Sequence, residues 1–237
     1  MNNLWIFGDS FSEDVKNIPL KNCGRWEYIN KYLNGNPYKS WGELLAEKLG
    51  LTYRNHAASG GYNFSHMGFG NSNDYIIANS SYYSKYFKKD DIVIIGLTSI
   101  HRFSWIIDEG PFMVLPNLYP PNVDTNILDS ILVQRENNFY YEQIITQLLL
   151  FKSLSKSIGF KLFFWSWEGE FEKFIQKNKL PQDNWILMKR TPPEYHWLLD
   201  PNKSLTIYSK TNGEIHDYHN SKEGELAHSK LFFELIE

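Results

Sequence analysis

The sequence predicts an α/β protein with three layers, in which helices cover both faces of a mostly parallel sheet. Short apolar runs typical of buried strands alternate along the chain with longer segments whose apolar residues recur at helical spacing. Residues 91–99 (DIVIIGLTS) are the clearest strand, because β-branched residues dominate them, and residues 140–160 are the clearest helix. Regular alternation of strand and helix indicates parallel strands joined by helical crossovers. The 237 residues suffice for one such domain, spanning 1–237.

Local sequence signals predict where the first strand and the first helix begin and end. Residues 4–7 (LWIF) form a short apolar strand that stops at Gly8. Residues 40–50 (SWGELLAEKLG) have helical spacing, with Ser40 as the N-cap and Gly50 as the C-terminal stop. The same reasoning predicts further strands at 51–57, 91–99 and 161–167, and further helices at 73–87, 140–160 and 223–236.

Two long connections interrupt this alternation. Residues 11–39 separate the first strand from its helix, and residues 103–134 carry Pro111, Pro116 and the pair Pro120–Pro121. Connections of this length inside one domain usually serve as lids or binding loops. Both follow strands, so we expect both to lie over the carboxyl edge of the sheet.

Composition narrows the function classes. The net charge of −3 gives no basic stripe, so nucleic acid is not expected as a partner. No apolar stretch approaches the ~18 residues of a membrane span. The first strand begins at Leu4, which leaves no room for a signal peptide, so we expect a cytoplasmic location, or a chain from which such a segment has been removed. The composition does not indicate an oligomeric state.

Cysteine and aromatic content add two expectations. Cys23 is the single cysteine, which rules out a disulfide framework or a cysteine-based metal site within one chain. Aromatic residues make up 16% of the chain, more than a core of this size needs. Either some rings line a surface cleft that binds a ligand, or the core is itself unusually aromatic.

Four polar fragments fall at strand ends or before the last helix: GDSFS (8–12), NHAASGGYN (55–63), GLTSIHR (96–102) and IHDYHN (215–220). Open α/β sheets bind their ligands at the carboxyl ends of the strands. A serine hydroxyl becomes a nucleophile when an imidazole takes its proton, and that imidazole needs a carboxylate to orient it. Ser10, His219 and Asp217 could form this set. A metal cluster of His216, His219 and Asp217 is the weaker alternative, because the short spacing does not suit three ligands on one loop.

From Gly8 to the last helix, these fragments resemble the motif blocks of the SGNH (GDSL-type) hydrolases. The resemblance implies a flavodoxin-like three-layer fold and an esterase that needs no cofactor or metal. It makes Ser10 the nucleophile, and it places His219, five residues before Gly224, as the base with Asp217 beside it. The amides of Ser10 and Gly60 would receive the oxyanion.

The third block departs from the family pattern, because Thr98 stands where the family has an asparagine that donates to the oxyanion. Thr98 could donate through its hydroxyl or merely cap the strand. His101 and Arg102 could supply a replacement donor. Asp9 is expected to cap the turn or helix after the first strand. Asp9, Asn63, His101 and Arg102 are also candidate contacts for the substrate or the oxyanion.

The predicted function is therefore hydrolysis of a small-molecule or carbohydrate ester with a short acyl group. Two alternatives stay open: an acyltransferase that moves an acetyl group to a glycan or other acceptor, and a non-catalytic carbohydrate-binding module on the same fold. Aromatic residues in the two long connections favour a sugar-bearing or small acyl ester over a long fatty chain; they are Trp26, Tyr28, Tyr32, Trp105, Phe112 and Tyr119.

Overall fold

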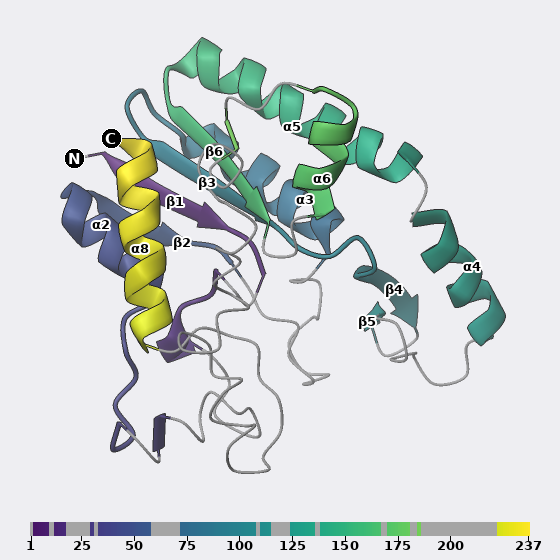
Figure 1. The fold of residues 1–237 in the computed structure, drawn as a ribbon, viewed down its shortest axis with the longest axis horizontal. Coiled ribbons are helices and arrows are strands. Elements are labelled where there is room, and N and C mark those ends of the chain that lie inside the picture. The colour runs from purple at the N-terminus through teal and green to yellow at the C-terminus, as the bar shows by residue number, and fades with distance from the viewer. Residues whose placement is uncertain are drawn as a thin grey trace.

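The computed structural model contains a parallel four-stranded sheet with helices on both faces (Figure 1). It describes residues 2–9, 12–17, 29–30, 33–57, 72–107, 110–114, 124–135, 138–166, 170–180, 184–185 and 222–237. The strands are β1 (Asn3–Phe7), β2 (Thr52–Asn55), β3 (Ile92–Leu97) and β6 (Lys161–Ser166), in the order β2-β1-β3-β6. The predicted α/β class and its four main strands are confirmed, and the arrangement is compatible with three layers.

Two groups of helices cover the sheet. Helices α2 (Trp41–Leu49) and α8 (Lys222–Ile236) lie on the near face in Figure 1, where the C-terminal end of α8 lies beside the start of β1. Helices α3 (Asn73–Tyr83), α5 (Asn138–Ile158) and α6 (Glu170–Lys177) pack on the other face. Within the described ranges, no helix combines the length and the apolar character that crossing a bilayer requires.

The ends of α2 follow the predicted signals. The Ser40 side chain accepts from the main-chain N–H of Glu43, and the Glu43 carboxylate accepts from the Ser40 N–H, which completes a capping box. Gly50 ends the helix at φ 66°, a left-handed conformation that glycine adopts without a Cβ penalty.

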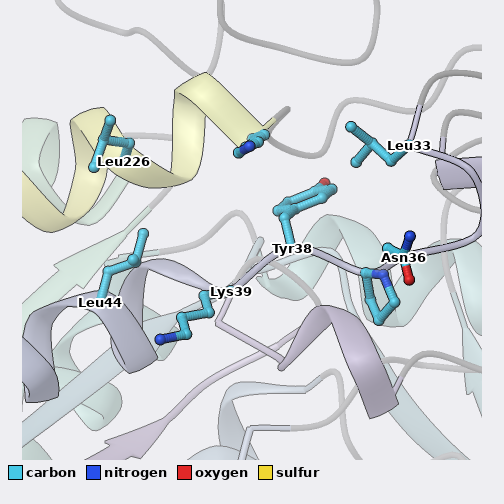
Figure 2. Close-up of a pocket in the computed structure, with 8 residues that line it drawn as sticks. Leu33, Asn36, Tyr38, Lys39, Leu44 and Leu226 are labelled. Carbon is cyan, nitrogen blue, oxygen red and sulfur yellow. The ribbon is translucent and has the colours of Figure 1, made fainter.

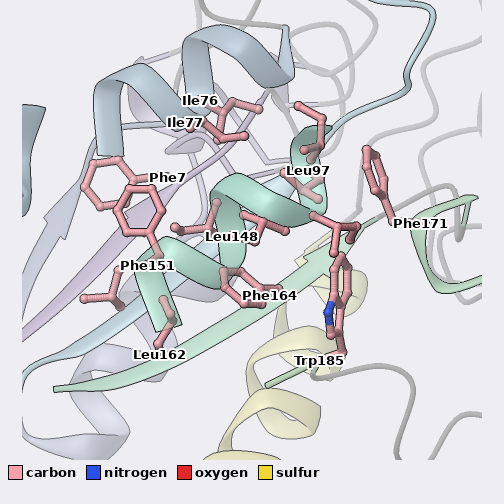
Figure 3. Packing of buried hydrophobic residues seen from close by; sticks show 14 of the residues in the cluster. Phe7, Ile76, Ile77, Leu97, Leu148, Phe151, Leu162, Phe164, Phe171 and Trp185 are labelled. Carbon is pink, nitrogen blue, oxygen red and sulfur yellow. The ribbon is translucent and has the colours of Figure 1, made fainter. Parts of the chain in front are cut away.

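The alternation of side chains along the strands divides the core in two. Leu4 and Ile6 of β1 pack toward α2 and α8, whereas Trp5 and Phe7 face α3 and α5. Figure 3 shows the second cluster, in which Phe151 and Leu148 of α5 lie over Phe164 and Leu162 of β6. The described core is thus rich in aromatic rings, which agrees with the expectation of an unusually aromatic core.

The long connection over 103–134, expected to be a lid or binding loop, contains helix and strand that were not predicted. The chain there forms an antiparallel hairpin, β4 (Phe103–Ile107) and β5 (Gly110–Val114), followed by α4 (Thr125–Arg135). Pro111 is compatible with β5 because this sheet has two strands, so each is an edge strand. Helix α6 was also not predicted, and α3 is shorter than expected because a 3-10 turn (Ser84–Tyr86) replaces its last residues.

Candidate active site

The carboxyl ends of β1 and β3 form the switch point of the sheet. From β1 the chain runs through α2 to β2 on one side, whereas from β3 it runs to β6 on the other. Ligands of open α/β sheets bind in the crevice at such a point. The register pairs Phe7 with Ile95, so Asp9 and Thr98 emerge from neighbouring strands at the same edge.

The Asp9 carboxylate is buried there and joins the two strand ends. Its side chain is 2% exposed, and its Oδ2 atom accepts from Thr98 Oγ1 at 2.7 Å and from Arg102 Nη1 at 3.1 Å. The main-chain oxygen of Asp9 accepts from Ser12 N at 2.9 Å and closes the turn after β1. The sequence placed Asp9, Thr98 and Arg102 at one edge, and the structure brings them into direct contact.

The Thr98 hydroxyl has a single hydrogen to donate, and in this structure it forms a hydrogen bond to the Asp9 carboxylate. Donation to an oxyanion would require Thr98 to leave Asp9, so the geometry is the one expected of a residue that caps the strand end. The main chain of Thr98 is also held: its N–H donates to Asn73 Oδ1 at 2.9 Å, and its carbonyl accepts from Asn73 Nδ2 at 3.0 Å. Asn73 is fully buried at the start of α3 and was not singled out from the sequence.

The turn that carries His101 and Arg102 is fixed by a second arginine. Arg135 of α4 donates from Nη1 to the carbonyls of Ile100 (3.4 Å) and Arg102 (3.3 Å). Its Nη2 donates to Asp74 Oδ2 at 2.9 Å. The Arg135 guanidinium lies 4.4 Å from the ring centre of Tyr140, and burial raises the pKa of that tyrosine to about 12. His101 and Arg102 are both half-buried in this turn.

Two glycines allow the segment after β1 to pack directly on β3. A Cβ on Gly8 would lie 2.5 Å from Ser12 Oγ, and a Cβ on Gly96 would lie 2.5 Å from Trp165 Nε1 and 3.0 Å from Ser12 Oγ. Ser12 is 1% exposed. The chain therefore returns to the sheet two positions after Ser10.

A second buried carboxylate connects this segment to β2 and α2. Asp14 Oδ1 accepts from Ser40 Oγ and from Asn55 Nδ2, each at 2.9 Å, and from the Tyr53 hydroxyl. Burial, with Asp14 alongside, raises the pKa of the Tyr53 hydroxyl far above its usual range. Asn55, which begins the predicted second block, also donates to the Ser12 carbonyl at 2.8 Å.

The start of α8 is anchored at the same edge. The buried Glu225 carboxylate accepts from the Trp41 N–H at 2.6 Å, which joins the first turns of α8 and α2. One turn further, His228 packs against Trp41 and Trp165, with ring centres 5.2 and 5.0 Å away, and burial holds its pKa well below the ordinary value. A pocket of about 540 Å³ opens beside these helix starts, lined by Leu33, Tyr38, Lys39, Leu44 and Leu226 among others (Figure 2).

Several predicted residues lie outside the described residues, so their roles stay predictions. They include the whole triad and the second oxyanion residue. No three histidine, cysteine, aspartate or glutamate side chains within the described ranges group closely enough to hold a metal ion. The side chains of Trp105 and Phe112 are likewise not described. The residues that were singled out from the sequence and lie outside the described ranges are Ser10, Cys23, Trp26, Tyr28, Tyr32, Gly60, Asn63, Tyr119, His216, Asp217 and His219.

Comparison of the chain with family models, with curated proteins and with solved structures gives no match in any of the three.

Proposed function

We propose that this chain is a serine ester hydrolase of the SGNH type that acts on a short acyl or carbohydrate-linked ester. The observation that carries the proposal is the position of the Gly8-Asp9-Ser10 motif. Asp9 lies at the switch point of the sheet, where Thr98 and Arg102 from the β3 end hold its carboxylate. Ser10 follows Asp9 directly in the chain.

The other two residues of the proposed triad lie shortly before α8 in the sequence. His219 precedes Lys222, the first residue of α8, by three positions, and Asp217 precedes it by five. The bond between Glu225 and Trp41 keeps this end of α8 beside α2. Ser10 thus follows the end of β1, and Asp217 and His219 precede the start of α8, which Glu225 holds beside α2.

In the proposed reaction, Ser10 Oγ attacks the ester carbonyl while His219 takes the serine proton. The carbonyl electron pair moves to oxygen, and the Ser10 and Gly60 amides stabilise the resulting oxyanion. Collapse expels the alcohol, which receives its proton from His219 and leaves an acyl-serine. Water then attacks the acyl group with His219 again as base, which releases the acid and restores Ser10. Asp217 orients the imidazole throughout, and no cofactor takes part.

The described residues have positioning roles in this scheme. The Asp9 contacts fix the direction in which the chain leaves β1, and Asn73 fixes the main chain of Thr98. Since the Thr98 hydroxyl donates to Asp9, the proposal assigns the oxyanion to main-chain amides.

That same bond favours a second candidate, a non-catalytic carbohydrate-binding module on this fold. Loss of one oxyanion donor typically lowers turnover about 10²–10³-fold. A chain with that loss could retain the fold and the crevice and serve only to bind.

The test is hydrolysis of a panel of short- and long-chain nitrophenyl esters and acetylated sugars by wild type, Ser10→Ala and Ser12→Ala. We expect wild type to hydrolyse short or sugar-linked esters and Ser10→Ala to lose this activity. Ser12→Ala is the matched control from the same turn and should retain it. Activity that survives in Ser10→Ala but disappears in Ser12→Ala would contradict the assignment of the nucleophile. Binding of a sugar ester without hydrolysis by wild type would favour the binding module.

A further inference from the structure

A second pocket, which the proposed reaction does not use, opens along β1 and β2. It has a volume of about 470 Å³ and lies between residues of β1 and β2 and the segment that joins α3 to β3. Asn3, the first residue of β1, and Lys88, four positions before β3, both line it. His56, which directly follows β2, lines it as well, whereas Asp9, Thr98 and Arg102 of the crevice are not among its described lining residues.

One wall of this pocket is a stack of aromatic rings. The His56 ring lies 3.8 Å from Tyr83 with planes 27° apart, and Trp5 lies 5.7 Å from His56 with planes 18° apart. Tyr86 is 50% exposed at the rim. Burial, together with the nearby Arg54 charge, lowers the pKa of His56. The His56 ring is consequently neutral at pH 7 and extends the aromatic wall.

Three further lining residues are basic. Arg54 pairs with Trp5 in the parallel register of β2 and β1, and Lys85 and Lys88 come from the segment before β3. All three side chains are exposed, and within the described part of the chain none of them forms an ion pair. Lys85 Nζ instead lies 3.9 Å from the ring centre of Tyr82.

Among the described residues, no acidic side chain lines the pocket, although the chain as a whole carries a net charge of −3. The Asp91 carboxylate, which directly precedes β3, is fully buried. It accepts from Asn3 N, Trp5 Nε1 and Lys88 N, and it therefore holds three pocket-lining residues in place. These bonds occupy the carboxylate, which is buried away from the exposed Arg54, Lys85 and Lys88 side chains. Three like charges without a counterion repel one another, and a bound anion would relieve that repulsion.

We propose that this pocket binds a nucleoside phosphate, with its planar base against the aromatic wall and its phosphates on Arg54, Lys85 and Lys88. Aromatic faces stack on bases, and arginine and lysine are the side chains that recognise phosphate oxygens. A neutral sugar would leave the three cations without a partner, and an isolated anion would leave the aromatic wall unused. The volume falls in the range of small-molecule sites.

The test is calorimetric titration of the full chain with ADP, and separately with adenosine and with pyrophosphate. We expect ADP to bind more tightly than either half of the ligand. Arg54→Gln and Lys85→Gln should each weaken ADP binding about tenfold or more. Lys230→Gln, an exposed lysine on α8 on the other face of the sheet, is the matched control and should bind ADP as wild type does.

Three outcomes would overturn the proposal. They are no binding of ADP at millimolar concentration, ADP affinity that is the same in wild type and in both pocket variants, or pyrophosphate binding as tight as that of ADP. The last result would leave an anion site without a role for the rings. Circular dichroism of each variant distinguishes a lost site from a lost fold. The outcome is independent of ester hydrolysis, since none of these residues belongs to the proposed triad.

Discussion

Replacing Thr98 with valine removes one hydroxyl from the site and keeps the shape of the side chain. The structure fixes the expected cost. Thr98 Oγ1 donates to Asp9 Oδ2 at 2.7 Å, and both residues are 2% exposed, so water cannot take the place of the lost donor. A hydrogen bond to a charged group contributes about 1.5–3 kcal/mol. Because Arg102 still donates to the same oxygen at 3.1 Å, we expect a loss near the middle of that range, about 2 kcal/mol.

The assay is urea unfolding followed by far-UV circular dichroism, with the free energy of unfolding taken from the midpoint and slope. Thr146→Val is the matched control. Its hydroxyl also donates at 2.7 Å, to the Glu142 carbonyl, but it lies on the exposed side of α5. We expect that control to change stability by less than about 0.5 kcal/mol. A Thr98→Val loss no larger than the control's would refute the role of this bond.

The same variant also reports on the oxyanion. If turnover of folded Thr98→Val falls about 10²–10³-fold while substrate binding is unchanged, the hydroxyl does serve as a donor during the reaction. In that case the oxyanion hole would not rest on main-chain amides, and Thr98 would have to exchange Asp9 for the substrate. A turnover that falls only in Arg102→Ala would assign the kinetic role to that arginine.

Gly96→Ala should destabilise the fold by about 1–3 kcal/mol in urea unfolding, because the new methyl would lie 2.5 Å from the indole nitrogen of the buried Trp165; unchanged stability would contradict the packing described. Burial lowers the pKa of His228, so below its ordinary pKa of 6.5 the unfolded chain binds a proton that the folded chain does not. Stability should therefore fall with pH below 6.5 by up to about 1.4 kcal/mol per pH unit from this residue, and His228→Phe should have a shallower slope. Arg54→Gln should raise the pKa of His56 in an NMR titration, because one of its two lowering causes is removed; burial, the larger cause, should keep it below 6.5.

The sheet and its flanking helices could be predicted because each has a local signal. The Ser40 cap and the Gly50 stop mark α2 within the sequence itself. The hairpin over 103–114 and α4 could not be read in the same way, since the prolines around them suggest a loop. Only two α4 side chains, Leu128 and Leu132, are buried in the core, so its apolar pattern is weak. Helix α6 did carry a signal, because Phe171, Phe174 and Ile175 have helical spacing and are buried.

For the candidate site, the sequence predicted which edge of the sheet carries it, but not the hydrogen bonds between its side chains. Asp9 and Thr98 were both expected at strand ends, and the parallel register of β1 and β3 places them together. That Thr98 donates to Asp9 depends on side-chain geometry between residues 89 positions apart. Asn73 had no local signal, because its role is to pair with the main chain of Thr98 from the start of another helix.

The most direct test of the proposed function is covalent labelling with a fluorophosphonate, followed by mass-spectrometric mapping of the modified peptide. The proposal predicts one adduct, on Ser10, that forms slowly in His219→Ala and not at all in Ser10→Ala. Ser12→Ala should be labelled at Ser10 as wild type is. A preparation that hydrolyses esters yet is labelled at another serine, or at none, would contradict the assignment of Ser10 as the nucleophile.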